Sequence, residues 1–337
     1  MMASTSPDEG STHVRKRRRT LQLAVASALL GSLPLAARAQ REVYPERPMT
    51  LIVPFTAAGG TDLTARIFAR VLEKYAKQSV MVLNRAGAGG EIGMAQVSRS
   101  APDGYTLGLL NTPNVVSIPI EREAQFQLAS FDPLASLVDD PATLSVHGDS
   151  PVRSLQDLVA LARQRPDELH YGTAGVGSAG HLSLLLLQQK TGIRLRHVPY
   201  KGTADVRTAL LGRQLDVAAV NLSEALAFGE GVPWRTLGVM SQARSPFVPT
   251  LPTFTEAGYP ILWGSLRGIG VPKGLPPECR AKLSAMVIDA AKDSRFIGDT
   301  KVAKQEVRLL AGDEYVKELL RQRDQLQALW NTSPWQV

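Results

Sequence analysis

Short apolar runs alternate with helix-period segments along most of the chain. The first apolar run is LIVPF, at residues 51–55, and a Gly-rich turn separates it from a segment, 62–77, whose apolar residues fall on one helical stripe. The second run is VMVL, at 80–83, followed by another Gly-rich turn and a helical segment at 92–100. Strands that alternate with helices in this way predict parallel sheet built from βαβ units. We therefore expect an α/β fold.

The same alternation continues toward the C-terminus. Apolar runs predict further strands at 105–110, 144–146, 197–200, 216–220, 237–240 and 266–271. Helix-period segments are expected after Ser154 and at 182–189, 204–211, 277–291 and 313–329. The stretch 111–133 is the least regular part of the pattern, because it holds Pro113, Pro119 and Pro133.

Four turns, most of them Gly-rich, stand before predicted helices, in two groups. The first pair spans 56–62 and 84–93, and the second pair spans 173–180 and 201–203. Glycine reaches positive φ and admits the close approach of a ligand, and helix starts offer unpaired N–H groups to anions. Ligands of open α/β sheets bind outside the carboxyl ends of the strands. We therefore expect two similar lobes that present these turns to a shared, anion-binding cleft.

The first forty residues have the composition of an export signal. Five basic residues, 15–19, precede an apolar stretch at 21–35, and Ala37-Arg38-Ala39 fits the small-x-small cleavage rule. The apolar stretch is shorter than the ~20 residues that a spanning helix needs. We expect residues 1–40 to be a cleaved signal peptide and the protein to reside in the periplasm. Arg18-Arg19 also fits a twin-arginine signal, so the Sec and twin-arginine routes both stay open.

Composition narrows the classes of partner. The 337 residues include 38 Lys and Arg against 31 Asp and Glu, a net charge of +7. Residues 1–40 hold six of those bases and two of those acids, so residues 41–337 keep 32 bases and 29 acids, a net charge of +3. No long basic tract remains there, so we expect no binding to DNA or other nucleic acid. The single cysteine, Cys279, excludes an internal disulfide and zinc sites built from several thiolates.

Motifs for cofactors and catalysis are incomplete. The stretch GAGGEIG, 87–93, has Ile92 where a dinucleotide fingerprint needs glycine. The stretch VGSAG, 176–180, has valine where a nucleophile elbow needs its first glycine. The histidines at 147, 170, 181 and 197 lack the spacing of a metal site, and we expect them to pack in the core or on the surface. We expect no cofactor, no metal and no enzymatic activity, with an exported hydrolase that uses Ser178 as the unfavoured alternative.

Seven stretches carry a resemblance to a known family. They are YPERP (44–48), LIVPFTAAGGTD (51–62), VLNRAGAGGEIG (82–93), APDGYTLGLL (101–110), YGTAGVGSAGHL (171–182), VPYKGTADVRTALLGRQLDV (198–217) and LPTFTEAGYP (251–260). In this order and spacing the chain resembles the Bug-type receptors, the extracytoplasmic solute-binding proteins of tripartite tricarboxylate transporters. The resemblance covers 42–330 and implies a two-lobed, type II periplasmic-binding-protein fold of the Venus-flytrap kind, with a mixed sheet in each lobe. One lobe would be 41–143 with 256–337, and the other 144–255.

The resemblance also implies a function. Such a receptor would capture a small organic carboxylate between its lobes, largely through backbone amides and water, and deliver it to the membrane subunits of a transporter. We expect it to act as a monomer. A protein of the same fold that presents its ligand to a signalling partner is the alternative.

By position, the resemblance implies a ligand site drawn from both lobes. The first lobe would supply Phe55, Ala58, Gly59, Gly60, Thr61, Asp62, Gly89 and Thr112. The second lobe would supply Gly175, Gly177, Ser178, Lys201, Gly202 and Asn221. Asp62 also lies where a helix start favours a carboxylate, and Lys201 fits a solvated turn as well as it fits a ligand contact.

Three positions depart from the family's usual pattern. Ala58 replaces a glycine, so we expect a negative φ there. Val220 replaces an acidic residue. Arg267 stands where the family is apolar or small, and we expect it either to pair with the ligand or to form a surface or interlobe salt bridge. These departures bear on which carboxylate is bound and not on the class of protein.

Overall fold

The computed structural model describes residues 1–2, 44–332 and 334–335. The chain divides into two compact units, 1–43 and 44–337, and every described helix and strand belongs to the second. The predicted signal peptide, apart from Met1 and Met2, lies outside the described residues. No described helix has both the length and the apolar character that crossing a membrane requires.

The described strands of residues 44–337 form one mixed, 10-stranded sheet. Its order is β2 (Val80–Asn84), β1 (Met49–Val53), β3 (Thr106–Asn111), β9 (Gly264–Pro272), β4 (Phe131–His147), β7 (Val217–Asn221), β5 (His170–Thr173) and β6 (Arg196–Pro199), with β8 (Trp234–Val239) and β10 (Glu306–Val307) also paired to β4. β1 is parallel to β2 and β3, and β5 is parallel to β6 and β7. β4 and β9 run antiparallel to their neighbours. The predicted α/β fold with mixed sheets is confirmed.

Strand β4 joins the two lobes. Its residues 131–141 pair with β9, whereas residues 142–147 pair with β7 and β8. The chain returns between Met240 and Trp263, and the Met240 N–H donates to Ala142 O (2.8 Å) while the Trp263 N–H donates to Met240 O (3.0 Å). The apolar pattern predicts only 144–146 of this strand, because two aspartates and a proline interrupt the run at 139–141. Strand pairing on both sides overrides that local signal.

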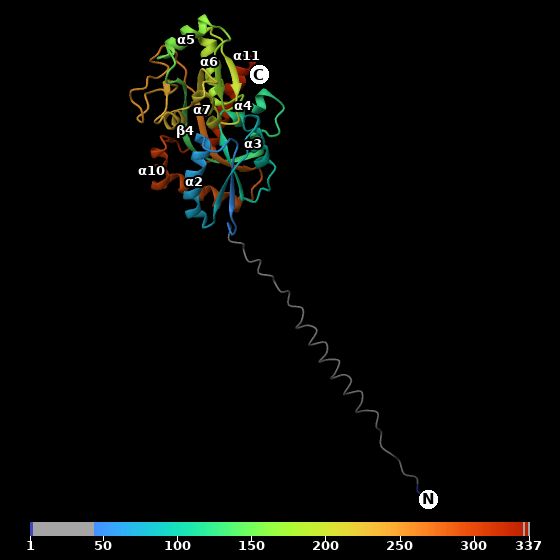
Figure 1. The fold of residues 1–337 in the computed structure, drawn as a ribbon. Helices are drawn as coiled ribbons and strands as arrows, with labels where there is room; N and C mark the ends of the chain where they lie inside the picture. Colours follow the sequence, from blue (N-terminus) through green and yellow to red (C-terminus); the bar gives the residue numbers. More distant parts are fainter. Residues whose placement is uncertain (3–43, 333, 336–337) are drawn as a thin grey trace. The chain divides into compact units, whose positions relative to one another are not determined.

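Helices cover both faces of the first lobe's sheet (Figure 1). One face packs against α2 (Gly60–Ala76), α9 (Pro277–Lys292) and α10 (Ser294–Val302). The other packs against α3 (Glu91–Ser98), α4 (Asn114–Glu121) and α11 (Asp313–Thr332). Strand β1 shows how the faces alternate, because Leu51 and Val53 join the first cluster and Ile52 joins the second.

The second lobe repeats this arrangement around its own sheet. One face packs against α5 (Leu155–Gln164) and α6 (Ala179–Thr191), and the other against α7 (Thr203–Leu211) and α8 (Leu222–Phe228). Ile261 packs with Phe254 into the second lobe's core and so lies beyond the expected boundary at 255. The sheet pairing changes partner between Pro141 and Ala142, close to the expected boundary at 143. The assignment of residue ranges to lobes stays a prediction.

Sequence expectations miss three of the described α-helices: α4, α8 and α10. The segment 111–133, expected to be irregular, contains α4 and a short 3-10 helix, η2 (Leu128–Ser130). Helix α4 accommodates its prolines because Pro113 is its N-cap and Pro119 lies near its end. Helix α10 follows α9 after a single residue, Asp293, whose side chain accepts a hydrogen bond from the Arg295 N–H (2.8 Å) and so starts the new helix.

Candidate functional site

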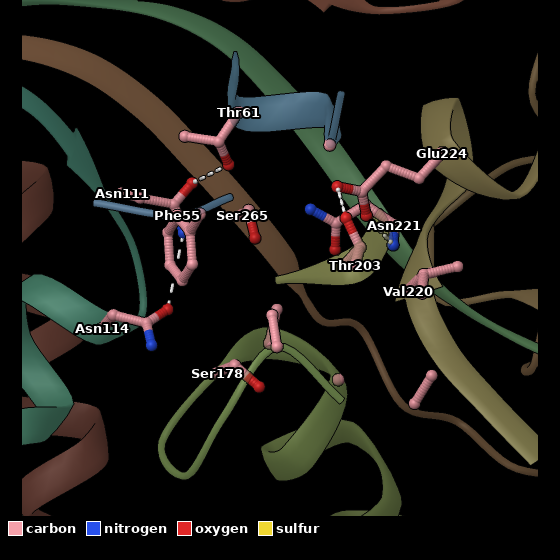
Figure 2. Close-up of a pocket in the computed structure, with 15 residues that line it drawn as sticks. Phe55, Thr61, Asn111, Asn114, Ser178, Thr203, Val220, Asn221, Glu224 and Ser265 are labelled. Atoms are coloured by element: carbon pink, nitrogen blue, oxygen red, sulfur yellow. Dashed lines mark hydrogen bonds between the residues drawn. The ribbon is translucent and has the colours of Figure 1, made fainter. Parts of the chain in front are cut away.

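A small cavity of about 30 Å³ lies between the lobes. It has room for about one or two water molecules. The first lobe contributes Phe55, Gly59, Thr61, Asn111, Asn114 and Ser265 to its lining, and the second contributes Ala174, Ser178, Ala179, Gly180, Thr203, Ala219, Val220, Asn221 and Glu224 (Figure 2). The polar groups in this set are mainly amides and hydroxyls, which suit hydrogen bonding to a small polar molecule.

The lobes touch each other around this cavity. The Gly60 N–H of α2 donates to Glu224 Oε1 of α8 (2.8 Å), and the Ser117 hydroxyl of α4 donates to Gly177 O (2.8 Å). A Cβ on Gly89 would lie 2.9 Å from Val176 O, so glycine is required for the contact made there. These contacts define a closed arrangement, and a ligand larger than a few atoms needs the lobes to part or the lining to move.

The turn before α2 is braced by Asp62. Its carboxylate accepts hydrogen bonds from the Ala58 N–H (2.9 Å), from Arg66 Nε (2.9 Å) and from Asn84 Nδ2 (2.9 Å). Burial by itself raises the pKa of Asp62, but the bonds from Arg66, Ala58 and Asn84 hold the pKa below its usual value. The Asp62 side chain therefore shapes the turn, while Gly59 is the N-cap residue and lines the cavity.

The expected negative φ at Ala58 is wrong. The residue is exposed and has a φ of 65°, in the left-handed region. This conformation costs an alanine roughly 1–2 kcal/mol. The hydrogen bond from its N–H to the Asp62 carboxylate offsets the cost, because a bond to a charged group contributes about 1.5–3 kcal/mol. The Asp62 carboxylate therefore stabilises a positive φ at this alanine.

Helix α6 starts differently, with neutral groups from its own lobe. Ser178 is its N-cap, and the Ser178 hydroxyl accepts a hydrogen bond from the His181 N–H (3.3 Å). The His181 ring accepts through Nδ1 from the Gly177 N–H (3.1 Å) and stacks on the His197 ring at 4.1 Å between centroids. Burial lowers the pKa of His181 to about 4, and burial with the neighbouring His181 lowers the pKa of His197 to about 3.

The same geometry bears on the hydrolase alternative. In a serine hydrolase the imidazole accepts a proton from the nucleophilic hydroxyl. Here the Nδ1 atom of His181 is bonded to a backbone N–H, and the Ser178 hydroxyl is bonded to the backbone of His181. In this arrangement both side chains hold the glycine turn.

The structure brings only part of the predicted site to the cavity. Phe55, Gly59, Thr61, Ser178 and Asn221 line it. The predicted residues that do not line it are Ala58, Gly60, Asp62, Gly89, Thr112, Gly175, Gly177, Lys201 and Gly202. Thr112 Oγ1 accepts a hydrogen bond from the Leu266 N–H (2.9 Å). The Lys201 side chain is exposed. A ligand-binding role for the predicted set stays a prediction.

Five polar residues of the lining were missed: Asn111, Asn114, Thr203, Glu224 and Ser265. Glu224 had a sequence signal, because an Asn followed three residues later by Glu has the spacing of a capping box, and Glu224 Oε2 accepts a hydrogen bond from the Asn221 N–H (2.9 Å). The asparagines lie where β3 ends and α4 begins, within the stretch expected to be irregular. Ser265 on β9 and Thr203 at the start of α7 carried no signal of their own.

Arg267 forms a buried charge cluster with Asp140 and Glu224 beneath the cavity. Its Nη1 lies 2.7 Å from Asp140 Oδ2, although the N–H bond is not directed for a hydrogen bond, and its Nη2 lies 3.9 Å from Glu224 Oε1. All three side chains are at most 4% exposed. Burial raises the pKa of Glu224, and the charge of Arg267 opposes this effect. Of the roles expected for Arg267, the structure contains the interlobe ion pair, which Arg267 makes with Glu224 of the second lobe and which is buried.

The fold and the cavity between its lobes define a two-lobed periplasmic binding protein. The family model described as "Tripartite tricarboxylate transporter family receptor" matches residues 64–315, and the chain belongs to this family of solute-binding receptors, whose members are periplasmic.

Named relatives agree with this assignment. The protein BugT of Bordetella pertussis is 33% identical over 282 residues, which cover 82% of this chain and 86% of BugT. The structure of the periplasmic binding protein BugD has a TM-score of 0.82 and 31% identity, covering 86% of this chain and 98% of BugD. A structure of R. palustris Rpa4515 with adipate has the same TM-score, identity and coverage.

Proposed function

We propose that this protein is an extracytoplasmic receptor that captures a small organic carboxylate in its interlobe cleft and delivers it to the membrane subunits of a tripartite tricarboxylate-type transporter. The observation that carries the proposal is a cavity lined from both lobes by hydroxyls, amides and the starts of α2 and α6. Family membership and the adipate found with a similar structure support a carboxylate as the ligand.

Neutral groups of this kind are sufficient for useful affinity. A hydrogen bond to a charged group contributes about 1.5–3 kcal/mol, and a partly buried helix N-terminus adds up to ~2 kcal/mol for an anion. A micromolar dissociation constant corresponds to about 8 kcal/mol. Three or four such contacts from Thr61, Ser178, Asn221 and the adjacent amides would supply it, without a basic side chain at the ligand.

Binding would be coupled to closure. Because the lining comes from both lobes, a ligand makes all its contacts only when the lobes meet. A ligand shifts an equilibrium between open and closed states by its difference in affinity for them. The closed receptor, exported to the periplasm and acting as a monomer, would then be the form that the membrane subunits recognise.

The test is a thermal-shift screen of the purified protein across mono-, di- and tricarboxylates. We expect a saturable shift for at least one compound, worth about 2.7 kcal/mol at a concentration of 100 times its Kd, with no chemical turnover. Thr61→Val should weaken binding by about tenfold, because it removes a hydroxyl from the lining at nearly constant volume.

Thr64→Val is the matched control for this experiment. Thr64 lies one turn further along α2, and its hydroxyl bonds Gly60 O (2.9 Å) and Gln305 Oε1 (3.0 Å) away from the cavity. The Thr64→Val variant should have a lower melting temperature than the native protein and the same Kd for the carboxylate. Absence of a saturable shift with every carboxylate would exclude the proposed function.

A further inference from the structure

A carboxylate of the protein itself occupies the start of α2. Glu224 reaches across from α8 in the second lobe, and its Oε1 accepts from the Gly60 N–H (2.8 Å) and from Thr203 Oγ1 (2.7 Å), as Figure 2 shows for Thr203. Its Oε2 accepts from the Asn221 N–H (2.9 Å). A helix start with a free N–H is a position that favours an anion. Here that position is filled by a side chain from the opposite lobe.

Glu224 also sets the charge of the cavity. Among the described residues that line the cavity, it is the only one with an ionisable side chain. The basic group behind it, Arg267, lies 2.7 Å from Asp140 and 3.9 Å from Glu224, so one positive charge faces two carboxylates. A second carboxylate brought to this end of the cavity by a ligand would meet Glu224 without a compensating cation. Like charges at such distances disfavour each other.

The opposite end of the cavity lacks such a group. At the start of α6 the Ser178 hydroxyl and the adjacent amides are neutral, and the nearby His181 ring is held as an acceptor for a backbone N–H. A single ligand carboxylate can therefore lie at the α6 end without meeting a fixed negative charge. A hydroxyl or ammonium group at the other end would donate to Glu224 or to the hydroxyl of Thr203.

We propose that Glu224 is a specificity-determining residue, which selects short monocarboxylates bearing a hydroxyl or ammonium group and rejects dicarboxylates. This inference rests on the proposed carboxylate-receptor function. It separates this protein from the similar structure that holds adipate, a dicarboxylate.

The experiment is isothermal titration of the purified protein and its variants with lactate, 3-hydroxybutyrate and alanine against succinate, malate and adipate. The native protein should bind its best monocarboxylate at least about tenfold tighter than any dicarboxylate, since one like-charge contact is worth one pKa unit or more. Glu224→Ser should move this ratio by at least about tenfold toward dicarboxylates, and Glu224→Gln should move it in the same direction. Gln keeps an oxygen for the Gly60 N–H, so loss of the charge is separated from loss of the contact.

Asp157→Asn is the matched control. Asp157 holds the same capping-box position in α5 that Glu224 holds in α8, but it lies away from the cavity. The Asp157→Asn protein should have the same ratio of monocarboxylate to dicarboxylate affinity as the native protein. A purely structural Glu224 would give Ser and Gln variants that weaken both ligand classes equally, and that result would overturn the inference while the receptor function stands. Failure of every carboxylate to bind the native protein would instead overturn the proposed function.

A second measurement needs no variant. The charged groups that face Glu224 are Arg267 on β9 and Asp140 on β4. Because burial raises the pKa of Glu224, titration of the native protein toward acid should neutralise this group before ordinary carboxylates. The preference for monocarboxylates should then decline toward the ratio of Glu224→Gln as the pH falls. A ratio that does not change with pH, in a protein that remains folded, would overturn the inference even if the variants fail to fold.

Discussion

The starts of α2 and α6 face the same cavity, yet they are completed in opposite ways. The α2 start receives a charged carboxylate, Glu224, from the other lobe, whereas the α6 start is capped by its own Ser178 and braced by the neutral His181 ring. In the first arrangement the α2 dipole stabilises a carboxylate of the protein itself. In the second, the α6 dipole can stabilise a carboxylate of a ligand. Two Gly-rich turns that look equivalent in sequence thus differ in the charge they can accept.

The supporting layers differ in the same way. Behind α2 lies a cluster of three buried charges, Arg267, Asp140 and Glu224. Behind α6 lies a stack of two histidines that burial keeps neutral at neutral pH. A buried charge destabilises the fold when its partner is removed. A buried neutral base makes the stability of the fold depend on pH, because it must take up a proton in acid. The α2 region should therefore be sensitive to loss of a charged side chain, and the α6 region should be sensitive to acid.

The largest expected effect is the loss of Arg267. Arg267→Met should lower the free energy of unfolding by about 3–5 kcal/mol, because it leaves Asp140 and Glu224 buried without a cation. Urea denaturation measures it. Arg308→Met is the matched control, since Arg308 Nη1 also lies 2.7 Å from an aspartate, the adjacent Asp139, but with side chains 41% and 39% exposed. Loss of this exposed pair should lower the free energy of unfolding by about 0–1 kcal/mol. Equal losses in the Arg267→Met and Arg308→Met variants would contradict the importance given to the buried cluster.

Acid should act on the α6 side. The folded pKa of His181 lies below its unfolded value of 6.5, so the unfolded state takes up its proton first as the pH falls. Stability is therefore full above pH 6.5 and declines toward pH 4, by on the order of 3 kcal/mol for this residue. His181→Asn should reduce the slope of stability against pH in urea titrations, because asparagine does not ionise in this range. An equal slope in the native and His181→Asn proteins would exclude His181 as its source.

Overpacking at Gly60 probes the contact between α2 and Glu224. A Cβ there would lie 2.7 Å from Glu224 Cγ and 2.8 Å from its Oε1. Gly60→Ala should cost about 1–3 kcal/mol, and much less in a Glu224→Ser background, which a double-mutant cycle would measure. Gly298→Ala is the control, because no atom beyond the neighbouring backbone of its own helix lies within 4 Å of a Cβ there, and alanine favours the interior of α10 by up to ~1 kcal/mol. Additive effects of the Gly60 and Glu224 changes would show that the two residues are not coupled.

The sequence predicts the periodic parts of this molecule well. Helix α2 begins at Gly60, two residues before the expected start at 62, and β1 and β2 lie where the apolar runs LIV and VMVL stand. Burial on both faces explains the apolar run of β1, whereas Met81 of β2 is exposed. The prediction fails where a distant partner overrides the local signal. Asp139-Asp140-Pro141 interrupts the apolar pattern, but it lies in β4, where Asp140 has Arg267 as its counter-ion.

The site is harder to predict than the fold for the same reason. Glu224 and Gly60 are 164 residues apart, so no local pattern links the carboxylate to the helix start that it occupies. Arg267 stood out in the sequence as a departure from the family's apolar or small residue, but its partner Asp140 could not be identified without the pairing of β4 with β9. The φ of Ala58 depends on Asp62, and a residue type alone does not specify it.

The smallest effect distinguishes the two helix starts through their caps. Ser178 and Ser154 each accept a hydrogen bond from the N–H three residues on, at 3.3 Å and 3.1 Å. Each Ser→Ala change should cost about 1 kcal/mol of stability, measured by urea denaturation. Only Ser178→Ala should also diminish the thermal shift caused by a bound carboxylate, because Ser178 lines the cavity and Ser154 does not. If Ser178→Ala kept the full shift, the ligand carboxylate would not lie at α6, and the neutral helix start would have no more to do with binding than the start of α5.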